Sequence, residues 1–333
     1  MNLPNMNISP QFHWRTEQRD GLEFIVLRCE TPSQNITSQE AWIAPSRGSN
    51  LCRFSVGNQH IIDFEQELLL KYDFTGTPVL YPTPNRVRNG IFRYHGKNFV
   101  QSKKNVMIYE HGLVHNESWN YQEPVVSSSS VTLKTWIDFN KFSAAFDAFP
   151  FIHRLALEFC LTETGIKIAY TIENQDEQAI PFGFGLHPYF NRLCGDQGTF
   201  IELPADSIMD YTSDLLPTGK LIAVDHTIFD LRNKTNIGML DLDHVFTGVT
   251  NGKYAQVIYS DLGLRVQLLT TDDFSHLVLY SPRGASFFCL ENQTCSTDAH
   301  NLYDRGFKTE SGLKLVPVGK VHTGSVTYLI IKE

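Results

Sequence analysis

Cysteine is scarce in this sequence and is never arranged in close pairs. The 333 residues include six cysteines, and no two of them form a CxxC motif. Closely paired cysteines are typical of structural zinc sites and of the disulfide frameworks of small secreted domains. We therefore expect buried or partly buried free thiols in a reducing compartment. The six are Cys29, Cys52, Cys160, Cys194, Cys289 and Cys295.

Long apolar runs and an excess of positive charge are also missing. No stretch of about 18 consecutive apolar residues occurs, so the sequence predicts no membrane-spanning helix. The N-terminal segment has no apolar core typical of a signal peptide, and we therefore expect a cytoplasmic protein. The formal net charge of −8 argues against a nucleic-acid partner, which would favour a basic surface.

Apolar residues alternate with period two through most of the chain. The segments 154–161 and 166–172 alternate on either side of a short loop around Gly165, which predicts an antiparallel hairpin with one apolar face. A second hairpin is expected over 255–270 for the same reason. Further strands are expected at 22–29, 51–56, 276–282, 285–291 and 325–332.

Helical patterns are confined to two short segments, 66–72 and 141–149. No internal repeat occurs, and the serine tract at 127–130 is short enough to be a loop or an edge strand. Many strands with so few helices predict an all-β fold, namely a large antiparallel β-sandwich. Because the prolines are spread along the chain and mark no linker, we expect one domain over residues 1–333.

Several segments combine ionisable side chains with turn residues and aromatic neighbours, an environment that shifts pKa values and favours proton transfer. Each candidate also has an ordinary structural interpretation. His187 could be a loop histidine, Glu291 could end a strand beside an arginine, and Asp243 could belong to a simple turn. The segments are YPTPNRVRNGIFRYHGK (81–97), EHGLVHNESW (110–119), GFGLHPYFN (183–191), DLDHVFTG (241–248) and FFCLENQTCSTDAHN (287–301).

These segments, in this order, resemble the aldose 1-epimerase (galactose mutarotase) family. LHPYFN matches the family's Leu-His-Pro-Tyr-Phe-Asn signature, NRVRNGIF is similar to its Asn-Arg-Ile…Gly-x-Phe segment, and EHG lies where its first His-Gly is expected. LDHVF and CLENQTCSTDAHN resemble its Asp-bearing and Glu-bearing segments, so the matches extend over about residues 45–300. Leu113 and Asn292 depart from the glycine and proline that are common at these positions. The first forty residues are not matched to a segment of the family, and we expect an N-terminal extension or an extra strand there.

The resemblance implies a galactose mutarotase-like supersandwich that interconverts the α and β anomers of free aldoses such as galactose or glucose. One group takes a proton from the anomeric hydroxyl while another gives a proton to the ring oxygen. We expect Glu291 to be the general base and His187 the general acid, with nearby carboxylates raising the pKa of His187 so that it keeps its proton. No metal or redox cofactor is implied. The residues expected to bind the sugar are Asn85, Arg86, His111 and Asp243.

Two other functions of the same fold stay open. A sugar-phosphate 1-epimerase would need cations at the rim of its cleft, which Arg86, Arg88 and Arg93 could provide. A non-catalytic sugar-binding module would keep the cleft and lose the acid or the base. In every case the expected partner is a small sugar, bound by a monomer or a homodimer. Aromatic residues beside the motifs could stack on the sugar, although core packing is commoner: Trp119, Tyr189 and Phe190.

A metal site is the third alternative. His111 and His115 have an H-x₃-H spacing, and His187 or Glu291 could complete a set of ligands. However, Gly112 disfavours the helix that such spacing requires, and the glutamate of zinc proteases is missing.

Overall fold

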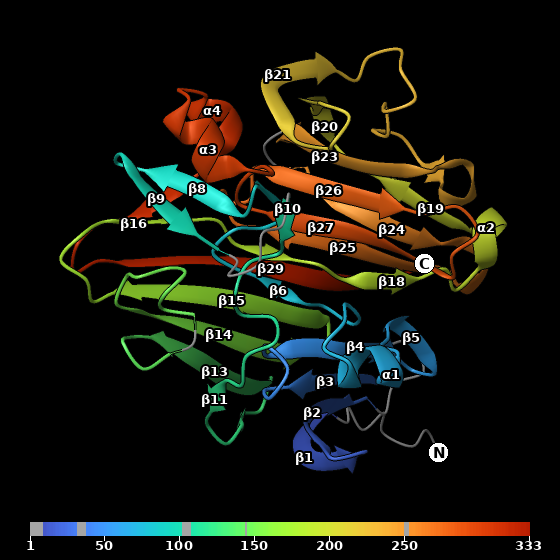
Figure 1. The fold of residues 1–333 in the computed structure, drawn as a ribbon. Coiled ribbons are helices and arrows are strands. Elements are labelled where there is room, and N and C mark those ends of the chain that lie inside the picture. The colour runs from blue at the N-terminus through green and yellow to red at the C-terminus, as the bar shows by residue number, and fades with distance from the viewer. Residues whose placement is uncertain (1–8, 32–37, 102–107, 144, 250–252) are drawn as a thin grey trace, which may run out of the picture.

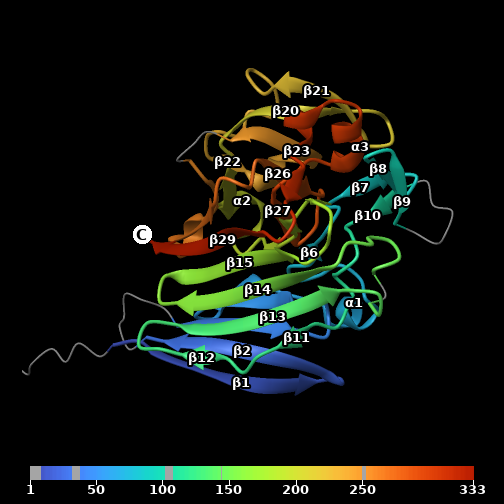
Figure 2. The same cartoon turned by 90° about the vertical axis from the view of Figure 1, so that its left-hand side faces the viewer.

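The structure is a computed structural model that describes residues 9–31, 38–101, 108–143, 145–249 and 253–333. Two large antiparallel sheets dominate it, as Figures 1 and 2 show. The blue N-terminal strands lie at one end of the molecule, and the gold strands β20 (Ala205–Tyr211) and β21 (Pro217–Ala223) lie at the other. The expected all-β fold with few short helices is confirmed.

The larger sheet has 13 strands. Two short strands, β6 (Val79–Leu80) and β17 (Gly185–Leu186), pair with each other, and β17 also pairs with β27. The continuous order of the others is β1 (Gln11–Arg19), β2 (Leu22–Glu30), β3 (Gln39–Ala44), β4 (Asn50–Val56), β5 (Gln59–Ile62), β18 (Tyr189–Asn191), β27 (Phe287–Gln293), β26 (His276–Ser281), β23 (Leu242–Val249), β20 and β21.

The second sheet has 10 strands. Their order is β11 (Asn120–Tyr121), β13 (Val131–Phe139), β14 (His153–Thr162), β15 (Gly165–Asn174), β29 (Val321–Lys332), β25 (Leu264–Thr270), β24 (Ala255–Tyr259), β19 (Thr199–Glu202) and β22 (Thr235–Asn236), with β12 (Val125–Val126) paired to β13. Three two-stranded sheets complete the fold of the described residues. They pair β7 (Arg86–Arg88) with β10 (Ile108–Glu110), β8 (Ile91–Tyr94) with β9 (Lys97–Val100), and β16 (Ile180–Phe182) with β28 (Lys314–Val316).

The alternating apolar residues face a core shared by both sheets. Leu155 and Leu157 of β14 belong to the same buried cluster as Ile25 and Leu27 of β2, which lies in the other sheet. Both predicted hairpins are confirmed as β14–β15 and β24–β25. The other predicted strands correspond to β2, β4, β26, β27 and β29, with small differences at their ends. All six cysteines are free and buried or partly buried, as the sequence predicts.

Helices are few and short: α1 (Gln66–Leu70), α2 (Gly195–Gly198), α3 (Ala299–Asp304), α4 (Lys308–Ser311), and the 3₁₀ turns η1 (Ile237–Met239) and η2 (Ser260–Leu262). None of those in the described ranges is long and apolar enough to cross a membrane. α1 confirms the prediction over 66–72. The serine tract at 127–130 forms a loop between β12 and β13.

The predicted helix over 141–149 is wrong for the described residues of that segment, which form turns instead. The Asn140 side chain accepts a hydrogen bond from the backbone N–H of Phe142, and Ser143 donates its hydroxyl to the Asn140 carbonyl. Such local side-chain bonds compete with a helix. Phe149 packs into the core just before Pro150, and a residue in that position avoids helical geometry.

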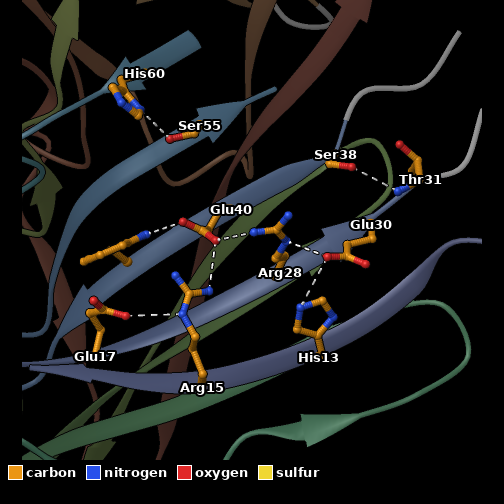
Figure 3. Close-up of polar contacts among 11 residues, drawn as sticks. His13, Arg15, Glu17, Arg28, Glu30, Thr31, Ser38, Glu40, Ser55 and His60 are labelled. Carbon is orange, nitrogen blue, oxygen red and sulfur yellow. Dashed lines mark hydrogen bonds and ion pairs between the residues drawn. The ribbon is translucent and has the colours of Figure 1, made fainter. Parts of the chain in front are cut away.

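The N-terminal segment supplies the extra strand, β1, which forms a hairpin with β2 at the edge of the larger sheet. A charged network covers one face of this hairpin and β3 (Figure 3). Arg15 and Arg28 both donate to Glu40 Oε2, at 3.0 Å and 3.2 Å, and the indole N–H of Trp42 donates to Glu40 Oε1 at 2.6 Å. Burial alone would raise the pKa of Glu40, but these donors hold it below its ordinary value.

Replacing Glu40 by glutamine should lower the free energy of unfolding by about 1–2 kcal/mol, because the two arginines lose the acceptor charge that they share. Urea unfolding at neutral pH measures the change. Because the pKa of Glu40 is lowered in the folded protein, its contribution is present above the unfolded pKa and is lost in acid, so the two curves should converge there. Glu67→Gln is the control, since the Glu67 side chain is 85% exposed and pairs with the exposed Lys71. An equal loss in both variants would contradict the prediction.

Candidate active site

His187 and Glu291 face each other across two paired strands. Gly185 of β17 pairs with Gln293, and Tyr189 of β18 pairs with Cys289, so the antiparallel register brings His187 directly opposite Glu291. Directly opposite side chains are close neighbours on one face of a sheet. His187 Nε2 lies 3.3 Å from Glu291 Oε1.

This pair is deeply buried. The side chains of His187 and Glu291 are only 7% and 2% exposed. Burial lowers the pKa of His187 to about 4, and burial raises the pKa of Glu291 well above its usual range. The expectation that carboxylates raise the pKa of His187 is therefore wrong for the protein without a bound sugar, because loss of solvation is the largest influence on this group. Burial therefore disfavours the charged form of each group.

A relay of amides holds the other oxygen of Glu291. Gln293 donates to Glu291 Oε2 at 2.8 Å, and Asn85 Nδ2 donates to Gln293 Oε1 at 3.0 Å. Asn85, which we expected to bind sugar, is buried, and its amide faces Gln293. The hydrogen bond from Gln293 opposes the burial effect by lowering the pKa of Glu291. Gln293 therefore both orients this carboxyl group and favours its ionised form.

Replacing Gln293 by methionine keeps its approximate volume and removes this donor. For the interconversion of sugar anomers that the family resemblance implies, we expect kcat to fall about tenfold. A hydrogen bond to a charged group contributes about 1.5 kcal/mol or more. The pKa of Glu291 should also rise further, which moves the acid limb of the pH–rate profile to higher pH. A uniform loss of activity at every pH would show that Gln293 has only a structural role. Gln256→Met, at another buried glutamine on β24, is the matched control.

Arg86 lies beside the pair and is held by two carboxylates. Its Nε lies 2.9 Å from Glu110 Oε1 in an ion pair, and its Nη2 donates to Asp243 Oδ2 at 3.2 Å. The first contact follows from the pairing of β7 with β10, in which Arg86 is opposite Glu110. Asp243 comes from β23, so Arg86 joins the small sheet to the large one. Its guanidinium is a quarter exposed and can still donate to a bound molecule.

His111 completes one wall of the site. Its ring lies 5.2 Å from the ring of His187, edge to face, and burial lowers its pKa well below the ordinary value. The next residue is Gly112, and a larger residue does not fit there, because a Cβ would lie 2.3 Å from the Tyr81 carbonyl oxygen. His111 and Asn85 both adopt positive φ, and the His111 N–H donates to the Asn85 carbonyl. The backbone is thus constrained where the predicted site residues lie.

Among the buried imidazole nitrogens without a hydrogen-bond partner in the described part of the chain are Nδ1 of His111, Nδ1 of His115 and Nδ1 of His187. Buried polar atoms are seldom left unpaired, so these atoms can bind a polar ligand. His115 also lies nearby, with its ring 4.8 Å from that of Phe74. Nevertheless, no group of three or more His, Cys, Asp or Glu side chains among the described residues is arranged to hold a metal ion.

The chain is similar to known proteins over most of its length. The model of the aldose 1-epimerase family matches residues 40–328. The chain belongs to the aldose 1-epimerase family. It is 25% identical over 249 residues to the uncharacterized protein YihR of Escherichia coli (strain K12), covering 73% of this chain and 75% of that protein. It is 27% identical over 180 residues to the galactose mutarotase of Sus scrofa, covering 52% of this chain and 49% of that protein.

Solved structures share the fold of this family member. A galactose mutarotase-like protein from Clostridium acetobutylicum superposes with a TM-score of 0.82 at 20% identity, covering 97% of this chain and 99% of that one. The galactose 1-epimerase of Lactobacillus acidophilus NCFM gives a TM-score of 0.74 at 16% identity, covering 98% and 99%. At these identities the similarity establishes the galactose mutarotase-like fold.

Three residues of the site were not predicted from the sequence, namely Gln293, Glu110 and Phe74. Gln293 follows Glu291 by two positions on a strand, and this spacing alone predicts a shared face. Glu110 immediately precedes His111, but its pairing with Arg86 depends on a register that the sequence does not reveal. Phe74 gives no sequence signal, although its ring lies 4.7 Å from that of His111 and 6.1 Å from that of His187.

The three aromatic residues considered for stacking on the sugar differ in their distance from the His187–Glu291 pair. Tyr189 stacks on His187, with ring centroids 4.9 Å apart and planes 9° from parallel. Phe190 is fully buried against Phe288, and Trp119 donates its indole N–H to the Val114 carbonyl inside the core. Only Tyr189 of the three is therefore in a position to influence the His187–Glu291 pair.

Proposed function

We propose that this protein is a mutarotase that interconverts the α and β anomers of free aldohexoses such as galactose or glucose. The observation that carries the proposal is the buried 3.3 Å contact between His187 Nε2 and Glu291 Oε1. A proton donor and a proton acceptor in one dry site satisfy the minimum requirement of this reaction. Membership of the aldose 1-epimerase family supports the same reaction class.

In the proposed reaction, Glu291 takes the proton of the anomeric hydroxyl and His187 gives a proton to the ring oxygen. The ring C1–O5 bond breaks as the C1 carbonyl forms, and the open aldehyde rotates about the C1–C2 bond. Closure from the other face reverses both proton transfers, so the pair returns to its starting state. The reactive form has the shared proton on His187, and the uncharged pair reaches it by moving one proton across the short contact.

Arg86, Asp243 and His111 hold the sugar hydroxyls in this proposal. Arg86 offers a planar set of donors, and the Asp243 carboxylate accepts from neighbouring hydroxyls. The unpaired Nδ1 of His111 provides a further polar contact. Asn85 does not contact the sugar in this proposal. Its amide donates to Gln293, which in turn donates to Glu291.

A sugar-phosphate substrate fits the charges less well. Each arginine considered for a phosphate is already close to a carboxylate. Arg86 contacts Glu110 and Asp243, Arg88 lies 3.6 Å from Asp214, and Arg93 lies 3.8 Å from Asp304. Binding a dianion would require these carboxylates to be displaced or repelled, which favours an uncharged sugar.

Polarimetry of freshly dissolved α-galactose and α-glucose tests the proposal. The expected result is a protein-dependent acceleration of the optical change, proportional to enzyme concentration. Glucose 6-phosphate in a coupled assay for the β anomer tests the rival substrate, and we expect a much smaller kcat/KM. Absence of acceleration for both free sugars would overturn the proposal, and tight sugar binding without acceleration would identify a non-catalytic sugar-binding protein.

A further inference from the structure

Strand β1 is a long, regular strand with one free edge. It pairs with β2 over all nine of its residues, Gln11–Arg19, without a shift of register. It ends the larger sheet, and no strand among the described residues pairs with its other side (Figure 2). The free edge of a strand presents backbone N–H and C=O groups with which another strand can pair.

The other ends of the two large sheets are protected against such pairing. β21, at the opposite edge of the larger sheet, begins with Pro217 and shifts its register against β20. The end strands of the second sheet, β11, β12 and β22, have only two residues each. Prolines, irregular register and short strands are common devices against the association of sheet edges. Within the described ranges, β1 has none of the three.

The even-numbered residues of β1 present their backbone groups at the free edge. In an antiparallel pair, residues that exchange two backbone hydrogen bonds alternate with residues that exchange none. Asp20 and Gly21 both have positive φ and form a two-residue turn, so Arg19 and Leu22 are the first bonded pair. The odd-numbered residues of β1 therefore bond to β2, and the N–H of the exposed Thr16 points outward.

The odd-numbered side chains carry charges of both signs on one face (Figure 3). Arg15 donates to Glu17 from Nε at 3.4 Å and to Glu40 from Nη1 at 3.0 Å, so its Nη2 can donate across the free edge. If two copies of β1 pair antiparallel about Thr16, each Arg15 lies opposite the partner's Glu17. Centring the pair on Arg15 or on Glu17 would bring two like charges together, which destabilises a strand pair.

A pair centred on Gln18 would also place opposite charges together, namely Glu17 and the partner's Arg19. It would overlap only three residues of each strand, 17–19, whereas the pair centred on Thr16 overlaps seven, 13–19. The register centred on Thr16 therefore combines matched charges with the longer contact.

We propose that this protein forms a homodimer in which β1 of each copy pairs antiparallel with β1 of the other, with Thr16 on the two-fold axis. A second copy of this chain fits the edge because the charges of β1 complement themselves in this register. The larger sheet then continues from one copy into the other. Four strands separate β1 from β18 in the sheet, so the dimer does not depend on the proposed reaction at His187 and Glu291.

Size-exclusion chromatography of a concentrated solution, with light scattering, tests the dimer on the full chain. We expect twice the chain mass of 37.9 kDa for the wild type. Thr16→Pro should give the mass of one chain, because proline lacks the outward N–H and the bonds from Arg15 and Glu17 to β2 are kept. Thr16→Val is the matched control and should keep the doubled mass, since valine retains the N–H and favours strands. A wild type of single mass, or a Thr16→Pro protein of doubled mass, would overturn the proposal.

Reversing one charge at a time tests the register. Arg15→Glu and Glu17→Arg each bring like charges together at both symmetric contacts, so the dissociation constant of each homodimer should rise about tenfold or more. An equimolar mixture of the two variants should associate as tightly as the wild type, because two acidic residues of one copy then face two basic residues of the other. Sedimentation velocity measures both. A mixture that associates no better than either variant alone would contradict this register.

Thr16→Cys tests the position of the axis and leaves the charges in place. In a hydrogen-bonded pair the two Cα atoms lie about 5.5 Å apart, which is within the range of a disulfide. Mild oxidation should therefore cross-link two copies of this variant into a dimer band on a non-reducing gel. Gln18→Cys is the matched control, because the two copies of this residue lie about 14 Å apart along the strands and should not cross-link. Equal cross-linking of both variants, or none of Thr16→Cys, would overturn the assignment of the axis.

Discussion

His187→Asn and Glu291→Gln should each slow the interconversion of α-galactose anomers by about 10³-fold, because a positioned acid or base contributes roughly 10²–10⁴-fold. Glutamine is isosteric with glutamate, and asparagine keeps a polar group at position 187, so galactose binding should persist. The two losses should not add in a double variant, since either group alone lacks the partner that completes the proton exchange. Polarimetry with purified variants measures the rates.

The same Glu291→Gln variant should be more stable than the wild type at alkaline pH. Burial raises the pKa of Glu291 in the folded protein, so the unfolded chain releases this proton at a lower pH than the folded chain does. Stability is therefore lost as pH rises from the unfolded pKa towards the folded one, and glutamine removes that loss. We therefore expect Glu291→Gln to unfold at a higher urea concentration than the wild type at pH 8.

Urea unfolding at pH 5 and pH 8 checks the stability of Glu291→Gln, and the gain should be much smaller at pH 5. His60→Asn serves as the control for His187→Asn, because His60 is exposed and its ring Nδ1 is paired with the Ser55 hydroxyl, away from Glu291. It should leave both rate and stability unchanged. A Glu291→Gln protein that keeps its activity would contradict the assignment of the base.

Arg86→Gln should reduce kcat/KM for galactose about 100-fold. Two charge-assisted hydrogen bonds to the sugar contribute on the order of 1.5 kcal/mol each, which together corresponds to this factor. Removing the cation also leaves Glu110 and Asp243 without the charge that they share. Most of the effect should appear in KM, because Arg86 binds hydroxyls and does not transfer protons in the proposed reaction.

Arg93→Gln is the control for Arg86→Gln. Both arginines belong to the same NRVRNGIFR segment, but Arg93 is more than half exposed and lies 3.8 Å from Asp304. We expect less than a twofold change in kcat/KM for Arg93→Gln. If the two variants lose equal activity, Arg86 has no specific contact with the sugar and the segment matters only for folding.

The strands of this fold were predictable because one face of each is buried. The alternation at 154–161 and 166–172 leads directly to the β14–β15 hairpin. The helix predicted at 141–149 was wrong for two reasons. Phe149 is buried in the core, and the Asn140 and Ser143 side chains form hydrogen bonds with the backbone of their own turn. Neither tertiary packing nor a turn network of this kind is visible as periodicity. A single domain over 1–333 stays a prediction.

The site was predictable in its residue types more than in its interactions. The family resemblance pointed to His187 and Glu291, and the strand register brings them together. The sequence did not reveal that burial lowers the pKa of His187, because solvation depends on the whole surrounding structure. Asn85 was similarly assigned to the sugar, although its buried amide faces Gln293.

The pairing of β17 and β18 with β27 has a consequence for how the protein acquires activity. Strands β17 and β18 are about a hundred residues away from β27 in the chain. Contacts between such distant segments form late in folding, because closing the loop between them costs entropy. His187 and Glu291 meet only after those contacts exist. Recovery of mutarotation during refolding should therefore lag behind the recovery of strand structure, so that turnover itself reports completion of the larger sheet.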